Sequence, residues 1–217
     1  MIHADLKRSV WCLRSLNVLS VLLISALCWS AVLSAQTPAN DPTEITRQTV
    51  NEVMAEMKKN EAVYSKDNEK LNAMVQQRLL QLFNFKVMTQ LALGRSWMQA
   101  TPEEKSALAN EFRSLLVRTY TNVLFGSRNQ STTIKSTNTT SQGDVSIGME
   151  VSNPTGDPVT LTLRMRKYQA DWKVIDVSVN GVSLIVNYRT TFTREIQQSG
   201  VDGLIKSLVT KNRENAL

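Results

Sequence analysis

Apolar side chains recur every three or four positions through the first half of the chain, which is the spacing of one face of an α-helix. This pattern predicts helices over residues 42–57, 68–82 and 85–93. Asp41 and Asp67 precede the first two helices, where a carboxylate can accept hydrogen bonds from the free backbone N–H groups of the first turn. The first half of the chain is therefore expected to be helical.

The longest periodic stretch follows Thr101. Thr101 and Glu104 have the spacing of a capping box, and Pro102 occupies the first helical position. The stretch predicts a long helix with one continuous apolar stripe, which consists of Leu108, Phe112, Leu115, Leu116, Tyr120, Val123 and Leu124.

After Gly126 the apolar residues alternate with polar ones. This alternation predicts strands over residues 145–151 and 159–165, a further strand over 172–179, and an earlier one near Ile134. Consecutive strands joined by short turns form an antiparallel meander, and the alternation gives that meander one apolar face and one polar face.

Helical spacing returns over residues 183–192 and again over 204–209. Helices, then a meander, then helices predict an α+β fold in which helices cover one face of a curved antiparallel sheet. We expect a single domain over residues 41–212, since this length supports one sizeable core but not a comfortable pair. Residues 36–40 are then a tether, and residues 213–217 a C-terminal tail.

Residues 1–35 have the organisation of a secretory signal. Lys7, Arg8 and Arg14 precede an apolar run at 16–33, and small residues follow up to Ala35. We expect cleavage near Ala35 or one residue earlier. The alternative is an uncleaved anchor, because the apolar run approaches the ~20 residues that a membrane helix needs.

Cleavage would change the chemistry available to the chain. His3, Cys12 and Cys28 are the only histidine and cysteines, and the formal net charge would fall from +6 to +4. A chain without imidazole or thiol groups has no Ser-His-Asp triad, no cysteine nucleophile, no histidine or cysteine metal site and no disulfide. We therefore predict no catalytic residue, no metal site and no cofactor.

Two sets of charged residues leave other functions open. Asp176 is the one acidic residue in an apolar strand, where burial could make it a general base, or where it could simply bind a neighbouring loop. Basic residues gather near one hairpin end, and they could attract anionic lipid or an acidic partner, or form an ordinary solvated face: Arg164, Arg166, Lys167 and Lys173. No nucleic-acid partner is expected for an exported chain with 6% aromatic residues.

Several short patterns follow one another in a fixed order along the expected domain. They are Leu93-Gly94-Arg95, Trp97, Ala100-Thr101-Pro102-Glu103, Glu111-Phe112-Arg113, Leu115-Leu116, Trp172, Asp176, Gly181-Val182-Ser183-Leu184, Asn187-Tyr188-Arg189 and Gly200-Val201-Asp202-Gly203-Leu204. No single pattern is specific. As an ordered set, the chain resembles the MlaC, or toluene-tolerance, family of periplasmic phospholipid-binding proteins.

The resemblance implies a function and a fold. It implies a monomeric periplasmic carrier, not an enzyme, that moves phospholipids between an outer-membrane lipoprotein–porin complex and an inner-membrane ABC transporter complex with an MCE-domain protein. Such transport maintains the lipid asymmetry of the outer membrane. The implied fold is cone-like, similar to the nuclear transport factor, with an apolar cavity between the sheet and the helices.

The cargo determines what such a carrier must provide. Two acyl chains contain about 30 methylene groups, so their exposure to water costs on the order of 24 kcal/mol, against ~1 kcal/mol for one hydrogen bond to a headgroup. We predict that the protein encloses the tails and leaves the headgroup in water with little selectivity. The predicted lipid-binding residues are Ile147, Met149, Leu161, Leu163 and Val177 from the sheet, facing Tyr120, Val123, Leu124, Leu184 and Tyr188 from the helices.

Two alternatives to a carrier remain open at this point. One is a cone-fold enzyme built around Asp176, and the other is an envelope scaffold without a ligand. A two-lobed binding protein for small polar solutes is disfavoured, because the chain lacks repeated βαβ patterning.

Overall fold

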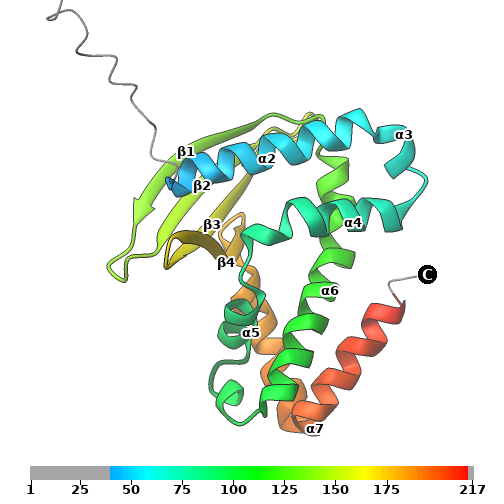
Figure 1. The fold of residues 1–217 in the computed structure, drawn as a ribbon, viewed down its shortest axis with the longest axis vertical. Helices are drawn as coiled ribbons and strands as arrows, with labels where there is room; N and C mark the ends of the chain where they lie inside the picture. The colour runs from blue at the N-terminus through cyan, green and yellow to red at the C-terminus, as the bar shows by residue number, and fades with distance from the viewer. Residues whose placement is uncertain (1–39, 215–217) are drawn as a thin grey trace, which may run out of the picture. The chain divides into compact units, whose positions relative to one another are not determined.

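The computed structural model describes residues 40–214 (Figure 1). The expected export signal, almost all of the tether and the last three residues of the tail lie outside the described residues. Within residues 40–214, no helix combines the length and the apolar character that crossing a bilayer requires.

The first half of the described chain is helical, as predicted. Asp41 accepts a hydrogen bond from the backbone N–H of Thr43 (2.9 Å), and Asp67 accepts one from Lys70 (3.0 Å), so both predicted caps are confirmed. The elements are α2 (Pro42–Lys59), α3 (Glu61–Tyr64), α4 (Asn68–Arg78), η1 (Leu80–Leu82), α5 (Phe85–Leu93), η2 (Gly94–Met98) and α6 (Pro102–Gly126).

The second predicted helix is shorter than its apolar pattern suggests. It ends at Arg78, and the chain tightens into the 3-10 helix η1. The reason is tertiary: Phe83 forms a bridge with Val174 of the sheet, and the backbone N–H of Asn84 donates to the Val174 carbonyl (2.9 Å). This attachment fixes η1 beside the sheet edge.

The sheet is an antiparallel meander in the order β1-β2-β3-β4-β5. Its strands are β1 (Thr132–Thr139), β2 (Val145–Val151), β3 (Val159–Tyr168), β4 (Asp171–Val179) and β5 (Val182–Ser183). The register shifts between Ile134 and Ser136 and again between Arg164 and Met165. Such irregularities bend strands and increase the twist, which is the source of the curvature.

The two C-terminal helices expected from the sequence are both present, and together they are longer than predicted. They make up α7 (Leu184–Glu214), in which the helical backbone is interrupted at Gly200. Gly200 has φ 71°, a conformation that a residue without Cβ adopts readily. Glu195 joins the two helical segments, because its carboxylate accepts hydrogen bonds from the Ser207 hydroxyl and the Lys211 ammonium group, both at 3.0 Å.

The buried side chains form three clusters. One joins α5, η2, α6 and α7, and in it Phe112 contacts Tyr188 and Phe192 edge-on at ring separations of 5.0 and 5.2 Å. A second lies on the apolar face of the sheet, and a third joins α2, α3 and α4. In Figure 1, α2 lies along the sheet, while α5, α6 and α7 pack on one another.

An ion pair between Asp144 and Arg166 makes the stability of the fold depend on pH. Asp144 is 1% exposed, and Arg166 donates two hydrogen bonds to its carboxylate, at 2.7 and 2.8 Å. These hydrogen bonds hold the pKa of Asp144 below its usual value, although burial acts in the opposite direction. The pair therefore stabilises the fold at neutral pH, and this contribution is lost as the pH falls through the lowered pKa.

We expect Asp144→Asn to lower the free energy of unfolding by about 2 kcal/mol at neutral pH, because it removes one partner of a largely buried charge pair. At acidic pH, once the native carboxyl is protonated, the free energies of unfolding of the variant and of the original chain should differ much less. Urea unfolding at both pH values measures this. If the free energies of unfolding of the two chains differed equally at both pH values, the role assigned to the Asp144 charge would be contradicted.

Candidate functional site

The apolar face of the sheet is covered by α2 and η1. Ile45 and Val50 of α2 pack against the buried sheet residues, together with Phe83. The buried members of this cluster are Leu82, Val145, Ile147, Met149, Leu163, Met165 and Val174. We call this set, with the α2 residues packed on it, the sheet–α2 cluster.

All five predicted sheet residues lie in the sheet–α2 cluster or pack against it. Ile147, Met149 and Leu163 are buried in it, and Leu161 and Val177 are partly exposed residues packed against it. The alternation of apolar and polar residues thus identified one continuous apolar surface. Contact between these side chains and a lipid stays a prediction.

The five predicted helix residues do not face the sheet together. Tyr120 and Tyr188 pack against the buried cluster that joins α5, η2, α6 and α7. Leu124 packs against the cluster that joins α2, α3 and α4. Val123 is 64% exposed, and Leu184 is half-buried at the first residue of α7. The expected pairing of the long helix with the sheet is therefore wrong.

The reason lies in competition between apolar surfaces. The buried residues of α6, Leu108 and Phe112 among them, pack with α5 and α7, which carry apolar stripes of their own. The sheet is left to α2, whose Ile45 and Val50 belong to a stripe visible in the sequence. Sequence reasoning therefore missed α2 as the covering element, although its periodicity was available.

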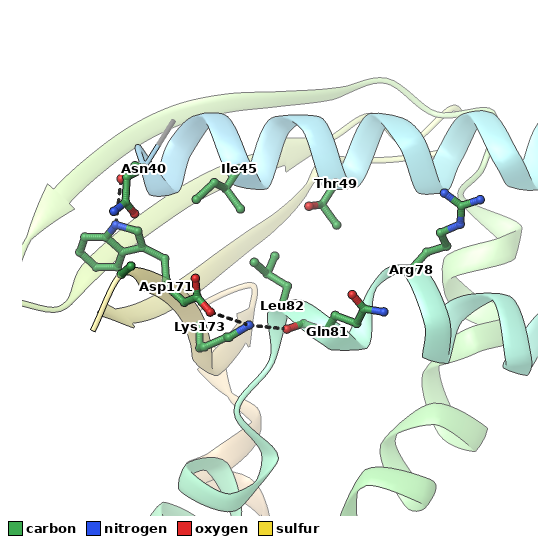
Figure 2. Close-up of a pocket in the computed structure, with 10 residues that line it drawn as sticks. Asn40, Ile45, Thr49, Arg78, Gln81, Leu82, Asp171 and Lys173 are labelled. Atoms are coloured by element: carbon green, nitrogen blue, oxygen red, sulfur yellow. Dashed lines mark hydrogen bonds and ion pairs between the residues drawn. The ribbon is translucent and has the colours of Figure 1, made fainter. Parts of the chain in front are cut away.

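A pocket of about 270 Å³ opens between α2, η1 and the turn from β3 to β4 (Figure 2). Ile45, Leu82 and Trp172 line it and also belong to, or pack against, the sheet–α2 cluster. These three residues place the pocket next to the covered apolar face. Its other lining residues are Asn40, Thr49, Arg78, Gln81, Ala170, Asp171 and Lys173.

Polar contacts surround the apolar floor of the pocket. The Trp172 indole N–H donates to the Asn40 carbonyl (3.0 Å), which holds the ring at the start of α2. The Lys173 ammonium group donates to the Gln81 carbonyl (3.0 Å) and lies 3.9 Å from the Asp171 carboxylate, as Figure 2 shows. Lys173 is thus committed to partners within the protein.

Side-chain contacts attach the first half of α2 to the sheet. The hydroxyls of Thr43 and Thr137 of β1 are 3.1 Å apart, and the Thr46 hydroxyl lies 3.4 Å from the Met165 sulfur. These contacts and the apolar packing are made by side chains, and no backbone hydrogen bond joins α2 to a strand among the described residues.

Asp176 has a structural role in the described chain. Its carboxylate accepts hydrogen bonds from the Ser183 hydroxyl (2.7 Å) and the Ile185 backbone N–H (3.3 Å), which caps the start of α7. Arg164 lies 3.8 Å away on the neighbouring strand. Asp176 is therefore one of the aspartates that bind a nearby turn.

The predicted basic group near the hairpin is largely paired. Arg164 faces Asp176, Arg166 binds Asp144, and Lys173 lies near Asp171. These pairs weaken the positive potential expected from the sequence. Within the part of the chain that the structure describes, no cluster of three or more His, Cys, Asp or Glu side chains could hold a metal ion.

Comparison with known proteins decides the family. The family model described as MlaC protein matches residues 47–210, which include most of α2, the whole sheet and Arg78, Leu82 and Trp172 of the pocket. The chain belongs to the MlaC family. The resemblance inferred from the ordered sequence patterns is confirmed.

Relatives of this MlaC-family chain include two curated proteins. The toluene tolerance protein ttg2D of Pseudomonas putida is 22% identical over 76% of this chain and 77% of that protein. The intermembrane phospholipid transport system binding protein MlaC of Haemophilus influenzae is 22% identical over 81% of this chain and 82% of its own length.

A solved structure is similar over nearly all of its length. It is the phospholipid-binding protein from Ralstonia solanacearum in complex with a phospholipid, with 33% sequence identity and a TM-score of 0.75, covering 82% of this chain and 99% of that one. The likeness confirms the predicted α+β class of this MlaC-family chain.

Proposed function

We propose that this chain is a periplasmic phospholipid carrier whose cargo places its acyl chains between α2 and the apolar face of the sheet. The observation that carries the proposal is the continuity of the pocket with the sheet–α2 cluster, through Ile45, Leu82 and Trp172. The bound phospholipid of the Ralstonia solanacearum protein supports the class of ligand.

The size of the cargo requires α2 to move. Pockets for small ligands measure roughly 300–1,000 Å³, so a pocket of about 270 Å³ admits only part of a phospholipid. As α2 separates from the sheet, lipid methylenes replace its contacts with residues such as Met149 and Leu163. The apolar surface then stays out of water, which keeps the cost of opening low.

Family membership supports a wider role. We propose that the chain carries phospholipid, as a monomer, between an outer-membrane lipoprotein–porin complex and an inner-membrane ABC transporter complex with an MCE-domain protein. This transport would maintain outer-membrane lipid asymmetry. The export pattern of residues 1–35 supports a periplasmic location.

We further propose that the chain acts by binding and not by catalysis. The capping contacts of Asp176 with Ser183 and Ile185 support this, because they occupy the carboxylate that an enzyme would need as a base. An Asp176→Asn variant that carries lipid normally would agree with a purely structural carboxylate.

Native mass spectrometry of the exported protein, purified without detergent, tests the carrier function. We expect a mass increase equal to one or more phospholipids, and extraction should identify the same lipid. An empty monomer under these conditions would favour a scaffold without a ligand and would contradict the carrier.

A further inference from the structure

We propose that Arg78 binds the phosphate group of the carried lipid at the mouth of the pocket. This inference rests on the proposed carrier function and adds a specific polar contact to it. The sequence alone had suggested a headgroup left in water, whereas the position of Arg78 favours recognition of the phosphodiester.

Arg78 lies at the edge of the apolar opening. It is the last residue of α4, and it lines the pocket together with Ile45, Thr49 and Leu82. Figure 2 shows its side chain extending from α4 toward α2. A lipid whose tails lie beneath α2 would present its phosphate where this apolar floor ends.

Arg78 also borders a second opening. A groove of about 360 Å³ between α2, α3 and α4 is lined by Arg78 together with Tyr64 and Met74. Glu56 lies in the same groove, but its carboxylate already accepts hydrogen bonds from Asn60 (2.8 Å) and Tyr64 (3.3 Å). Arg78 thus borders both the pocket and this groove, and both of them are lined in part by α2.

The guanidinium group is available for a ligand. Among residues 40–214 it takes part in no ion pair, and no side-chain hydrogen bond from it is found to another described residue. Lys173, the other basic residue of the pocket, is held by Gln81 and Asp171. Arginine presents five donors in a planar fork that matches phosphate oxygens, so Arg78 is the better phosphate ligand of the two.

The test uses the full mature chain, stripped of lipid, and two probes with identical acyl chains. Dioleoyl phosphatidylglycerol carries the phosphate, and dioleoylglycerol lacks it. We expect Arg78→Gln to weaken binding of the first about tenfold, as expected for loss of one charge-assisted contact, and to leave binding of the second within about twofold.

Lys167→Gln is the control. It removes the same charge from an exposed residue of β3 that lines neither the pocket nor the groove, so phosphatidylglycerol binding should change by less than about twofold. Arg78→Lys keeps the charge without the fork, and it should bind with intermediate affinity. Thermal unfolding of each variant verifies that the fold is intact.

Several outcomes would overturn the proposal. One is an unchanged phosphatidylglycerol affinity in Arg78→Gln, and another is an equal loss for both lipids, which would assign Arg78 a structural role. Tight binding of glycerol phosphate without acyl chains would indicate a soluble phosphoester as the ligand. If the original chain binds neither lipid, the carrier function itself fails, which is distinguishable because dioleoylglycerol binding is then absent as well.

Discussion

Linking α2 to β1 through a disulfide in the T43C/T137C variant is expected to reduce phospholipid uptake at least tenfold. The two hydroxyl oxygens lie 3.1 Å apart, so cysteines at these positions are close to disulfide geometry. The chain's own cysteines, Cys12 and Cys28, lie in the expected export signal, so the new bond would be the only one in the mature chain. A closed α2 leaves only the small pocket for two acyl chains.

Uptake of a fluorescent phospholipid from vesicles measures this effect. The oxidised variant should load poorly, and reduction should restore loading, since the same chain then differs only in the disulfide. S131C/S152C is a suitable control. The backbone N–H of Ser152 donates to the Ser131 carbonyl (2.9 Å) beside the β1–β2 pair, so the two positions are neighbours. A disulfide between them would not connect α2 to the sheet. Normal loading by oxidised T43C/T137C would show that α2 is not the moving element.

Leu161→Arg is expected to remove most of the co-purified phospholipid, with at least a tenfold drop in the lipid-to-protein ratio. Leu161 packs against the sheet–α2 cluster, so an arginine there places a charge against the surface proposed for the acyl chains. Burial of an unpaired charge costs several kcal/mol. Leu161 is partly exposed, so in the lipid-free protein the guanidinium group can extend to water and the fold should survive.

Val123→Arg is the matched comparison for Leu161→Arg. The sequence predicted both residues to line the cavity, but Val123 is 64% exposed in the structure. We therefore expect Val123→Arg to retain the original lipid-to-protein ratio. Lipid extraction and phosphorus analysis of both variants measure the ratio, and circular dichroism checks the fold. A loss of lipid in Val123→Arg, or its retention in Leu161→Arg, would contradict the placement of the cargo.

The sequence by itself determined most of the helices and strands of this protein. The caps at Asp41 and Thr101 and the alternation along β2 are local features, since they depend on backbone hydrogen bonds within one turn and on side chains two residues apart. The ordered patterns also identified the family. These inferences needed no knowledge of which distant segments meet.

Only the tertiary structure decided which apolar surfaces pack together. The stripes of α2 and α6 are both suited to cover a sheet, and periodicity says which residues share a face but not which partner that face finds. The partner depends on where chain connections place each element. Arg78 and Trp172 are far apart in the sequence. For the same reason, only the tertiary structure shows that they line one pocket.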